Sequence, residues 1–381
     1  MRREGRFTGD SLSGEVPARL VKPSRLPALT GLRSFAAMNL VFFHFSNPRW
    51  FGWLAPVVDA GFISVSFFLL LSGFILAYNY AERGARGEVS ARRFWKARLT
   101  RLYPVYLLSL LISVQMLHQE FYAHSRPMFI AGVVLTPLLL QGWSPALSTF
   151  WNTPAWTMST EVFFYAFFPF LIRWRMPRRW SRLIALLLIF WVLGMVAPAL
   201  YTWLLPDGDP HPGRYTNGVW MRALKYTPLP HLPSFLFGVT LAAVHQRIPA
   251  ASRIRFWLGI VGFASLYAVL FYGARLPYAM MHDGLLMPLF GVLILGLAGT
   301  NPLSHFFGFR GFVMIGEASY CLYLLHFNMW TLLHESGALQ WTGLIRFDPW
   351  ISYALLVLGA LAALHLVERP GARVMKRLLN A

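Results

Sequence analysis

Cysteine and charge are the two scarce features of this sequence of 381 residues. Cys321 is the only cysteine, so no disulfide bond within the chain can support the fold. Charged residues make up only 13% of the chain, about half of what the water-facing surface of a soluble globular domain carries. Hydrophobic residues make up 56%. Together these values argue against a soluble domain and predict a protein of the lipid bilayer.

Acidic residues are scarce as well, with 15 Asp and Glu against 34 Lys and Arg, for a net charge of +19. The basic residues lie in short segments between apolar runs, which is typical of loops that set membrane topology. We therefore expect membrane lipids, and no nucleic acid, as partners. Residues 1–28 are polar and basic, and we expect them to form a cytosolic tail rather than a cleaved signal peptide.

Eleven apolar runs are long enough, or nearly so, to cross a bilayer as helices. The basic segments 81–101 and 173–182 both belong on the cytosolic side by the positive-inside rule, yet three runs separate them. One of the three should therefore not cross. We expect this to be 127–142, which is short and contains two prolines. The runs are 29–45, 58–80, 102–117, 127–142, 154–172, 183–205, 228–244, 256–273, 282–299, 312–333 and 350–367.

The predicted fold is thus an all-α polytopic membrane protein with about ten transmembrane helices and one re-entrant or interfacial helix. Both termini lie in the cytosol in this interpretation, together with the loops 245–255 and 300–311. The membrane domain would extend over 29–370, between the tail 1–28 and a C-terminal tail at 371–381.

Arginines occur at or near the expected cytosolic ends of two apolar runs. Arg33 lies about one turn inside the first run, and Arg98 and Arg101 open the third run on one helix face. Charge at membrane depth is costly, so such residues are candidates for function. A cluster of arginines is suited to binding phosphate groups through paired hydrogen bonds.

Histidine and glutamate map to the expected outer halves of three runs. His44 lies eleven residues after Arg33, roughly 16 Å along the same helix. Glu161 and His326 fall at a similar depth, and an unpaired carboxylate there would be unfavourable. A neutral imidazole beside a carboxylate is suited to proton transfer, so the residues predict a proton-transferring group near the outer leaflet.

Six motifs follow one another in an order that resembles the membrane-bound acyltransferase family three, the O-acetyltransferases of cell-surface glycans and their relatives. One motif, Trp156 to Tyr165, departs mildly from the family pattern, with Thr157 and Met158 where Ser and Leu are usual. The motifs are Leu29-Thr-Gly-Leu-Arg33 with Phe-Phe-His44, Gly61-Phe-Ile-Ser-Val-Ser-Phe-Phe-Leu-Leu-Leu-Ser-Gly73, Arg98-Leu-Thr-Arg101-Leu-Tyr-Pro104, Trp156-Thr-Met-Ser159-Thr-Glu161-Val-Phe-Phe-Tyr165, Ser319-Tyr-Cys-Leu-Tyr323-Leu-Leu-His326 and Val367-Glu368-Arg-Pro370.

The resemblance implies transfer of an acyl group, most often acetyl, from cytosolic acyl-CoA to a hydroxyl group of a carbohydrate, a lipid-linked glycan or a related acceptor. Arg98 and Arg101, with Arg33, would hold the phosphates of acyl-CoA. His44 would act as the general base, with Glu161 orienting or charging it, either in a direct transfer, which we prefer, or by assisting a step through an acyl-enzyme intermediate. No metal is expected, and family habit suggests the bacterial inner membrane. Substrate contacts are expected from Ser72, Trp156, Ser159, Tyr165, Ser319, Tyr323 and His326.

Two other functions remain open at this stage. Intramembrane His and Glu can form the proton relay of a transporter or flippase, although no repeated half is evident in the sequence. A non-catalytic membrane sensor could keep the fold without the chemistry, although the intact arginine and histidine motifs argue against this.

Overall fold

The computed structural model describes residues 26–380, and every regular element in that range is helical. The expected cytosolic tail thus lies outside the described residues as far as residue 25. The elements are α1 (Pro27–Phe45), η1 (Pro48–Leu54), α2 (Ala55–Asp59), α3 (Ile63–Ala85), α4 (Ala91–Ile112), α5 (Met116–Ala123), α6 (Arg126–Leu135), η2 (Gln141–Trp143), η3 (Thr153–Ala155), α7 (Trp156–Leu171), α8 (Trp180–Leu204), α9 (Val219–Tyr226), α10 (Leu232–His245), α11 (Arg253–Phe271), η4 (Gly273–Arg275), α12 (Tyr278–His282), α13 (Met287–Leu297), α14 (Pro302–Phe307), α15 (Arg310–Glu317), α16 (Ser319–Glu335), α17 (Ala338–Trp341), η5 (Leu344–Phe347), α18 (Trp350–Ala363), η6 (Leu364–Glu368) and α19 (Arg369–Asn380).

Each predicted apolar run coincides with one or two of these helices, which confirms the all-helical fold and an integral membrane protein. Within residues 26–380, five helical segments are long and apolar enough to cross a bilayer, and the α4–α5 pair, bent by 75°, would be a sixth. The predicted count of about ten spans is not established by these lengths. α6 has 10 residues, roughly 15 Å of helix, which is too short for a bilayer core of about 30 Å. The segments that meet the length and composition criteria are Ile63–Ala85, Trp180–Leu204, Arg253–Phe271, Tyr278–Leu297 and Trp350–Leu379.

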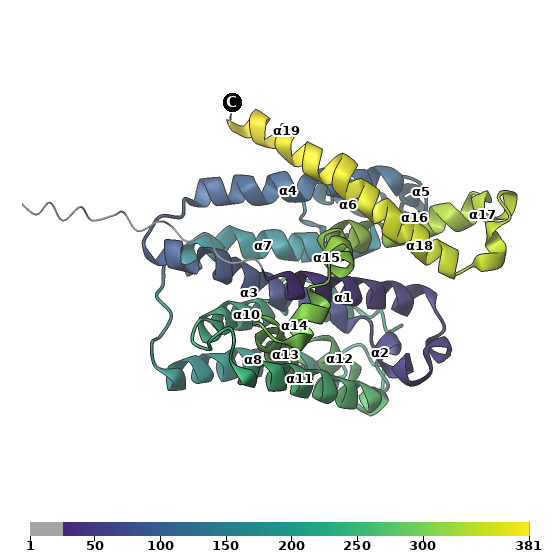
Figure 1. The fold of residues 1–381 in the computed structure, drawn as a ribbon. Coiled ribbons are helices and arrows are strands. Elements are labelled where there is room, and N and C mark those ends of the chain that lie inside the picture. Colours follow the sequence, from purple (N-terminus) through teal and green to yellow (C-terminus); the bar gives the residue numbers. More distant parts are fainter. Residues whose placement is uncertain (1–25, 381) are drawn as a thin grey trace, which may run out of the picture.

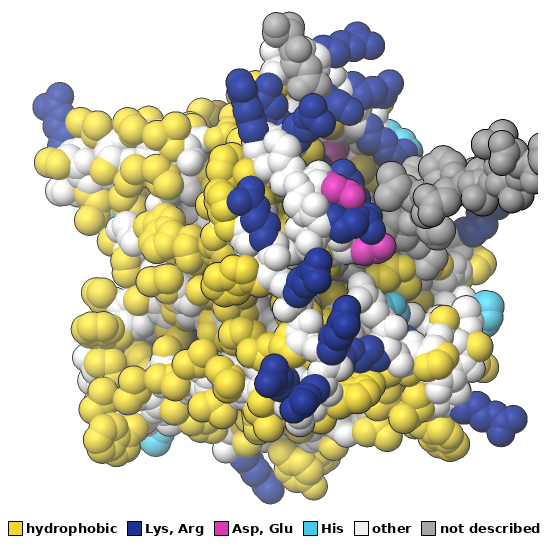
Figure 2. All heavy atoms as spheres, turned by 90° about the vertical axis from the view of Figure 1, so that its left-hand side faces the viewer, with side chains coloured by type: hydrophobic (Ala, Val, Ile, Leu, Met, Phe, Trp, Pro, Cys, Tyr) yellow, Lys and Arg dark blue, Asp and Glu magenta, His cyan; other side chains and the backbone are white. Residues whose placement is uncertain are grey.

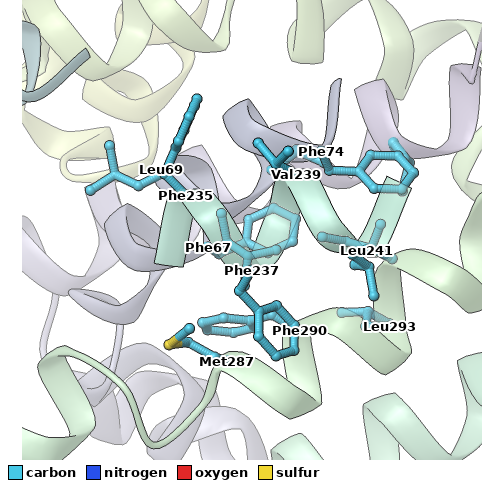
Figure 3. Close-up of a cluster of buried hydrophobic side chains, with 14 of the residues drawn as sticks. Phe67, Leu69, Phe74, Phe235, Phe237, Val239, Leu241, Met287, Phe290 and Leu293 are labelled. Carbon is cyan, nitrogen blue, oxygen red and sulfur yellow. The ribbon is translucent and has the colours of Figure 1, made fainter. Parts of the chain in front are cut away.

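The main hydrophobic core lies where α3, α10 and α13 cross (Figure 3). Glycines allow α3 and α10 to approach closely, because a Cβ atom on Gly73 would lie 2.1 Å from the carbonyl oxygen of Phe235. A Cβ on Gly238 would lie 2.0 Å from that of Leu70. Small residues at helix crossings serve this purpose in membrane proteins. The close crossing fixes the wall of the bundle formed by α3.

α1 lies between two hydrophobic clusters and so occupies the middle of the bundle. Leu32 and Leu40 belong to the core around α3 and α10, whereas Ala37 and Val41 belong to a second cluster with residues of α4, α16 and α18. Figure 1 shows α1, α3, α7 and α4 running side by side along the bundle. Polar side chains of α1 therefore face the interior.

The segments expected in the cytosol meet at one end of the bundle. Arg247 donates a hydrogen bond to the carbonyl of Pro177 (2.5 Å), which joins the loops after α10 and α7. Thr300 donates through its backbone to Ala250 (2.9 Å). Lys96 of α4 donates to the backbone of Leu379 in α19. Figure 2 looks onto this basic end and shows Lys and Arg side chains in a band between apolar flanks.

Candidate active site

Two adjoining chambers lie inside the bundle, and Val65 and Tyr323 line both of them. We call them the arginine chamber and the histidine chamber after their polar residues. The polar and charged lining of the arginine chamber is Arg33, Ser72, Arg98, Arg101, Thr157, Glu161, Tyr165, Ser319, Tyr320 and Tyr323. That of the histidine chamber is His44, Thr153, Trp156, Arg214, Tyr215, Lys225, Tyr226, Tyr278, His282, Tyr323 and His326.

The three predicted arginines converge on the arginine chamber from α1 and α4. Arg98 is held in place, since its guanidinium donates to the Tyr80 hydroxyl (3.0 Å) and lies over the Phe94 ring (5.4 Å). Arg101 stays half exposed, with 50% of its side chain accessible and Glu368 at 3.5 Å. Arg33 lies within electrostatic reach of Arg101. The chamber thus gathers three cations near the basic end of the bundle.

Glu161 lies in the arginine chamber, not beside His44 as its predicted role requires. The Ser72 hydroxyl donates a hydrogen bond to its carboxylate (3.0 Å), and its electrostatic partners are Arg98 and Arg33. The side chain thus opposes the repulsion among the arginines. Its expected action on His44 has no supporting contact among the described residues.

His44 and His326 form the centre of the histidine chamber. Their ring centroids are 5.3 Å apart, and His44 also packs on the Phe327 ring at 4.5 Å. The Nδ1 atom of His326 lies 2.6 Å from the carbonyl oxygen of Tyr323, which can only accept a hydrogen bond. Nδ1 must therefore carry the proton, which leaves Nε2 unprotonated. That Nε2 atom is buried and has no hydrogen-bond partner among the described residues.

The remaining predicted contact residues fall into three places. Tyr165 and Ser319 line the arginine chamber, where the buried Ser319 hydroxyl has no hydrogen-bond partner within residues 26–380. Trp156 lines the histidine chamber and Tyr323 separates the two. Ser159 lines neither chamber. Its hydroxyl instead donates a hydrogen bond to the side chain of Gln141 (3.2 Å), so it supports the packing around the chambers.

Three basic residues of the histidine chamber were missed by the sequence reasoning. Arg214 comes from the loop between α8 and α9, where nothing in the apolar pattern draws attention to it. Lys225 of α9 is only 2% exposed, and burial lowers its pKa to about 8. His282 ends α12 and lies 3.8 Å from the buried carboxylate of Asp283. The sequence drew attention only to the neighbouring Asp283, because it is an acidic residue near the end of an apolar run.

A comparison of this sequence with known protein families shows which family it belongs to. The acyltransferase domain family matches residues 26–367, nearly the whole described chain. The chain belongs to the acyltransferase family three. It is therefore an enzyme that transfers acyl groups, and the predicted family membership is confirmed.

Curated relatives of this acyltransferase carry matching names. Acyltransferase MdmB of Streptomyces mycarofaciens is 29% identical over 394 residues, which cover 95% of each chain. O-acetyltransferase OatA of Staphylococcus aureus is 24% identical over 335 residues, covering 81% of this chain and 51% of OatA. The chain thus spans about half the length of OatA. No solved structure matches this fold significantly.

Proposed function

We propose that this acyltransferase moves an acyl group, in the first instance acetyl, from cytosolic acyl-CoA to a hydroxyl group of a carbohydrate or related acceptor. The observation that carries the proposal is the pair of adjoining chambers. One gathers three arginines near the basic end, and the other brings two histidine rings close together. Arg33 and His44 lie eleven residues apart on α1, so a single helix connects the two.

The arginine chamber is suited to the donor. Acyl-CoA carries several phosphates, and planar guanidinium groups bind phosphate through two parallel hydrogen bonds. Arg101 is half exposed and can meet the nucleotide end, while Arg98 and Arg33 lie deeper. The pantetheine arm would then extend along α1 and bring the thioester past Tyr323 into the histidine chamber. This route requires the basic end, with both termini, to face the cytosol.

The histidine chamber is suited to the transfer step. His44 would take the proton of the acceptor hydroxyl as the oxygen attacks the thioester carbonyl. The CoA thiolate would then leave and accept that proton from His44. The bare Nε2 of His326 faces the same space and can accept a hydrogen bond from the acceptor. One direct step accounts for both histidines without an acyl-enzyme intermediate.

The acceptor class follows from the relatives. OatA is named an O-acetyltransferase, so hydroxyl acceptors are the first choice for this chain. The acceptor would enter the histidine chamber from the end opposite the basic loops, either free or on a lipid carrier. In a bacterium we expect the enzyme in the inner membrane, because that membrane borders the cytosolic pool of acyl-CoA.

The test is acyl transfer from radiolabelled acetyl-CoA by the full chain in nanodiscs, with release of free CoA followed as well. We expect turnover by the wild type and its loss in His44→Ala, with acetyl-CoA binding retained. His118→Ala, at an exposed histidine on α5, is the matched control and should remain active. Full activity of His44→Ala would refute the general base. A wild type that neither binds nor consumes acyl-CoA would refute the acyltransfer proposal and favour the transporter or the sensor.

A further inference from the structure

The loop between α8 and α9, residues 205–218, is built as an arch by its own polar contacts. The Asp207 carboxylate accepts hydrogen bonds from the backbone N–H groups of Trp220 (3.1 Å) and Met221 (2.8 Å) at the start of α9. Farther along, the Asp209 carboxylate accepts one from the Thr216 hydroxyl (2.6 Å). A loop with this many internal bonds holds one conformation and can present a side chain accurately.

Lys225 ties the arch to the body of the protein. Its ammonium group donates to the backbone carbonyls of Arg214 (3.2 Å) and Thr216 (3.1 Å), and it lies 4.8 Å from the centroid of the Tyr278 ring. α9 itself is fixed by Arg222, which donates to the carbonyl of Pro145 (2.7 Å). The buried ammonium group donates hydrogen bonds to these loop carbonyls and so fixes the position of the Arg214 backbone.

The side chain of Arg214 lies over the histidine chamber. Its guanidinium carbon is 3.8 Å from the centroid of the Phe43 ring, and the Phe43 ring in turn lies 4.9 Å from that of His44. Arg214 is also within electrostatic reach of His44 itself. Among the described residues that line the chamber, none is a carboxylate. The positive charge of Arg214 is therefore available to a substrate.

We propose that Arg214 is a second catalytic residue, which stabilises the oxyanion of the transfer step, and that Lys225 is the positioning residue for it. The inference rests on the proposed acyltransfer function. A fixed cation close to the base is the arrangement that lowers the energy of a developing negative charge.

The acceptor oxygen forms a bond to the thioester carbonyl carbon while its proton passes to His44, and the electrons of the C=O π bond move onto the carbonyl oxygen beside Arg214. When the C=O bond reforms, the carbon–sulfur bond breaks and the CoA thiolate takes the proton from His44. The negative charge on that oxygen develops only during the step, so Arg214, which keeps its proton throughout, affects the rate of the step and not donor binding.

The experiment uses acetyl-CoA hydrolysis by the full chain in nanodiscs, with water in place of an identified acceptor. We expect Arg214→Gln to lower kcat about 10²-fold, the loss typical for one oxyanion donor, with KM for acetyl-CoA unchanged. Low millimolar guanidinium chloride should restore part of the activity of Arg214→Ala. Arg275→Gln, at an exposed arginine stacked on Tyr272, is the control and should retain wild-type kcat.

A second variant tests the positioning role of Lys225. Lys225→Met should lower kcat, and the double variant with Arg214→Gln should be no slower than Arg214→Gln alone, because both act through one guanidinium. Additive losses would refute the positioning role. Wild-type kcat in Arg214→Gln, or a loss confined to KM, would overturn the proposal for Arg214 while acyltransfer stands. A wild type without turnover would instead overturn the proposed function and this inference with it.

Discussion

His44 and His326 face each other with their ring centroids 5.3 Å apart, although 282 residues of sequence separate them. Neither ring contacts a carboxylate among the described residues, so no buried negative charge favours the protonated form. Nδ1 of His326 is committed to the carbonyl of Tyr323 (2.6 Å). The pair therefore offers one imidazole as a base and one bare Nε2 as a fixed hydrogen-bond acceptor.

The first prediction concerns that acceptor. His326→Ala should lower kcat about 10²-fold, at the lower end of what acid–base groups contribute, because a second O–H of the acceptor, or of the attacking water in hydrolysis, would lose the hydrogen bond that orients it toward His44. His326→Gln, which can still accept a hydrogen bond, should recover part of the loss. Steady-state kinetics of acetyl-CoA consumption measure both variants. Equal loss in the two variants would argue for a purely steric role of the ring.

The second prediction separates donor binding from chemistry. Arg101→Gln should raise KM for acetyl-CoA about tenfold and leave kcat nearly unchanged, because a half-exposed hydrogen bond to a charged group is lost. The effect should disappear with acetyl-pantetheine, which lacks the nucleotide phosphates. Arg86→Gln is the control, since Arg86 lies at the same end but is paired with Glu82 and Glu88. An unchanged KM in Arg101→Gln would remove Arg101 from the donor site.

The helices could be predicted from the sequence, but the number of spans could not. The run predicted at 154–172 is α7, and the one at 29–45 is α1, because continuous apolar character specifies helix in a bilayer. Whether a helix crosses depends on its length and tilt against its neighbours. The run at 228–244 shows this, since α10 has only 14 residues and packs in the centre against α3.

Several residues of the candidate site could be predicted from the sequence, but the contacts of their side chains could not. Arg33 and His44 share a helix, so their separation along α1 followed from helical rise alone. Glu161 was expected beside His44 from its depth, but depth does not specify the direction in which a side chain points. The packing of α7 against α4 turns Glu161 toward the arginines. Arg214 lies in a loop, where no periodicity could predict its position over the chamber.

The third prediction uses the observed position of Glu161. Glu161→Gln should raise KM for acetyl-CoA about tenfold, because Arg33 and Arg98 would lose the carboxylate that offsets their repulsion. Ser72→Ala, which removes one hydrogen bond to that carboxylate, should cause a smaller rise. The pH dependence of kcat should not change in either variant. A shifted pH profile in Glu161→Gln would instead show that Glu161 acts on His44.

The fourth prediction concerns the stability of the basic end. Arg255 is 1% exposed and donates to the carbonyls of Leu295 (2.8 Å) and His245 (3.0 Å), which ties the ends of α13 and α10 to α11. Arg255→Met should destabilise the protein by roughly 3–6 kcal/mol, because several buried carbonyls would lose their donor. Arg253→Met, at an exposed position two residues earlier, is the control. Thermal unfolding in detergent measures the difference, and an equal midpoint for both variants would contradict the prediction.

The fifth prediction follows from the pKa of Lys225, which lies in α9 outside the apolar runs. Burial lowers this pKa from 10.5 to about 8 in the folded protein. Between about pH 8 and 10.5 the unfolded state therefore binds more protons at this residue than the folded state, so raising the pH favours folding. The unfolding midpoint of the wild type should rise relative to that of Lys225→Met across this window.

The comparison with Lys225→Met is needed because other groups titrate in the same range and cancel in the difference. Below pH 8 the lysine is charged in both states, so the difference between the two proteins should stay constant there. If the difference instead stayed constant up to about pH 10.5 and the wild type then lost stability relative to Lys225→Met, the hydrogen bonds to Arg214 and Thr216 would outweigh burial and hold the ammonium charged. The folded pKa would then lie above its ordinary value, and the arch would open as Lys225 lost its proton.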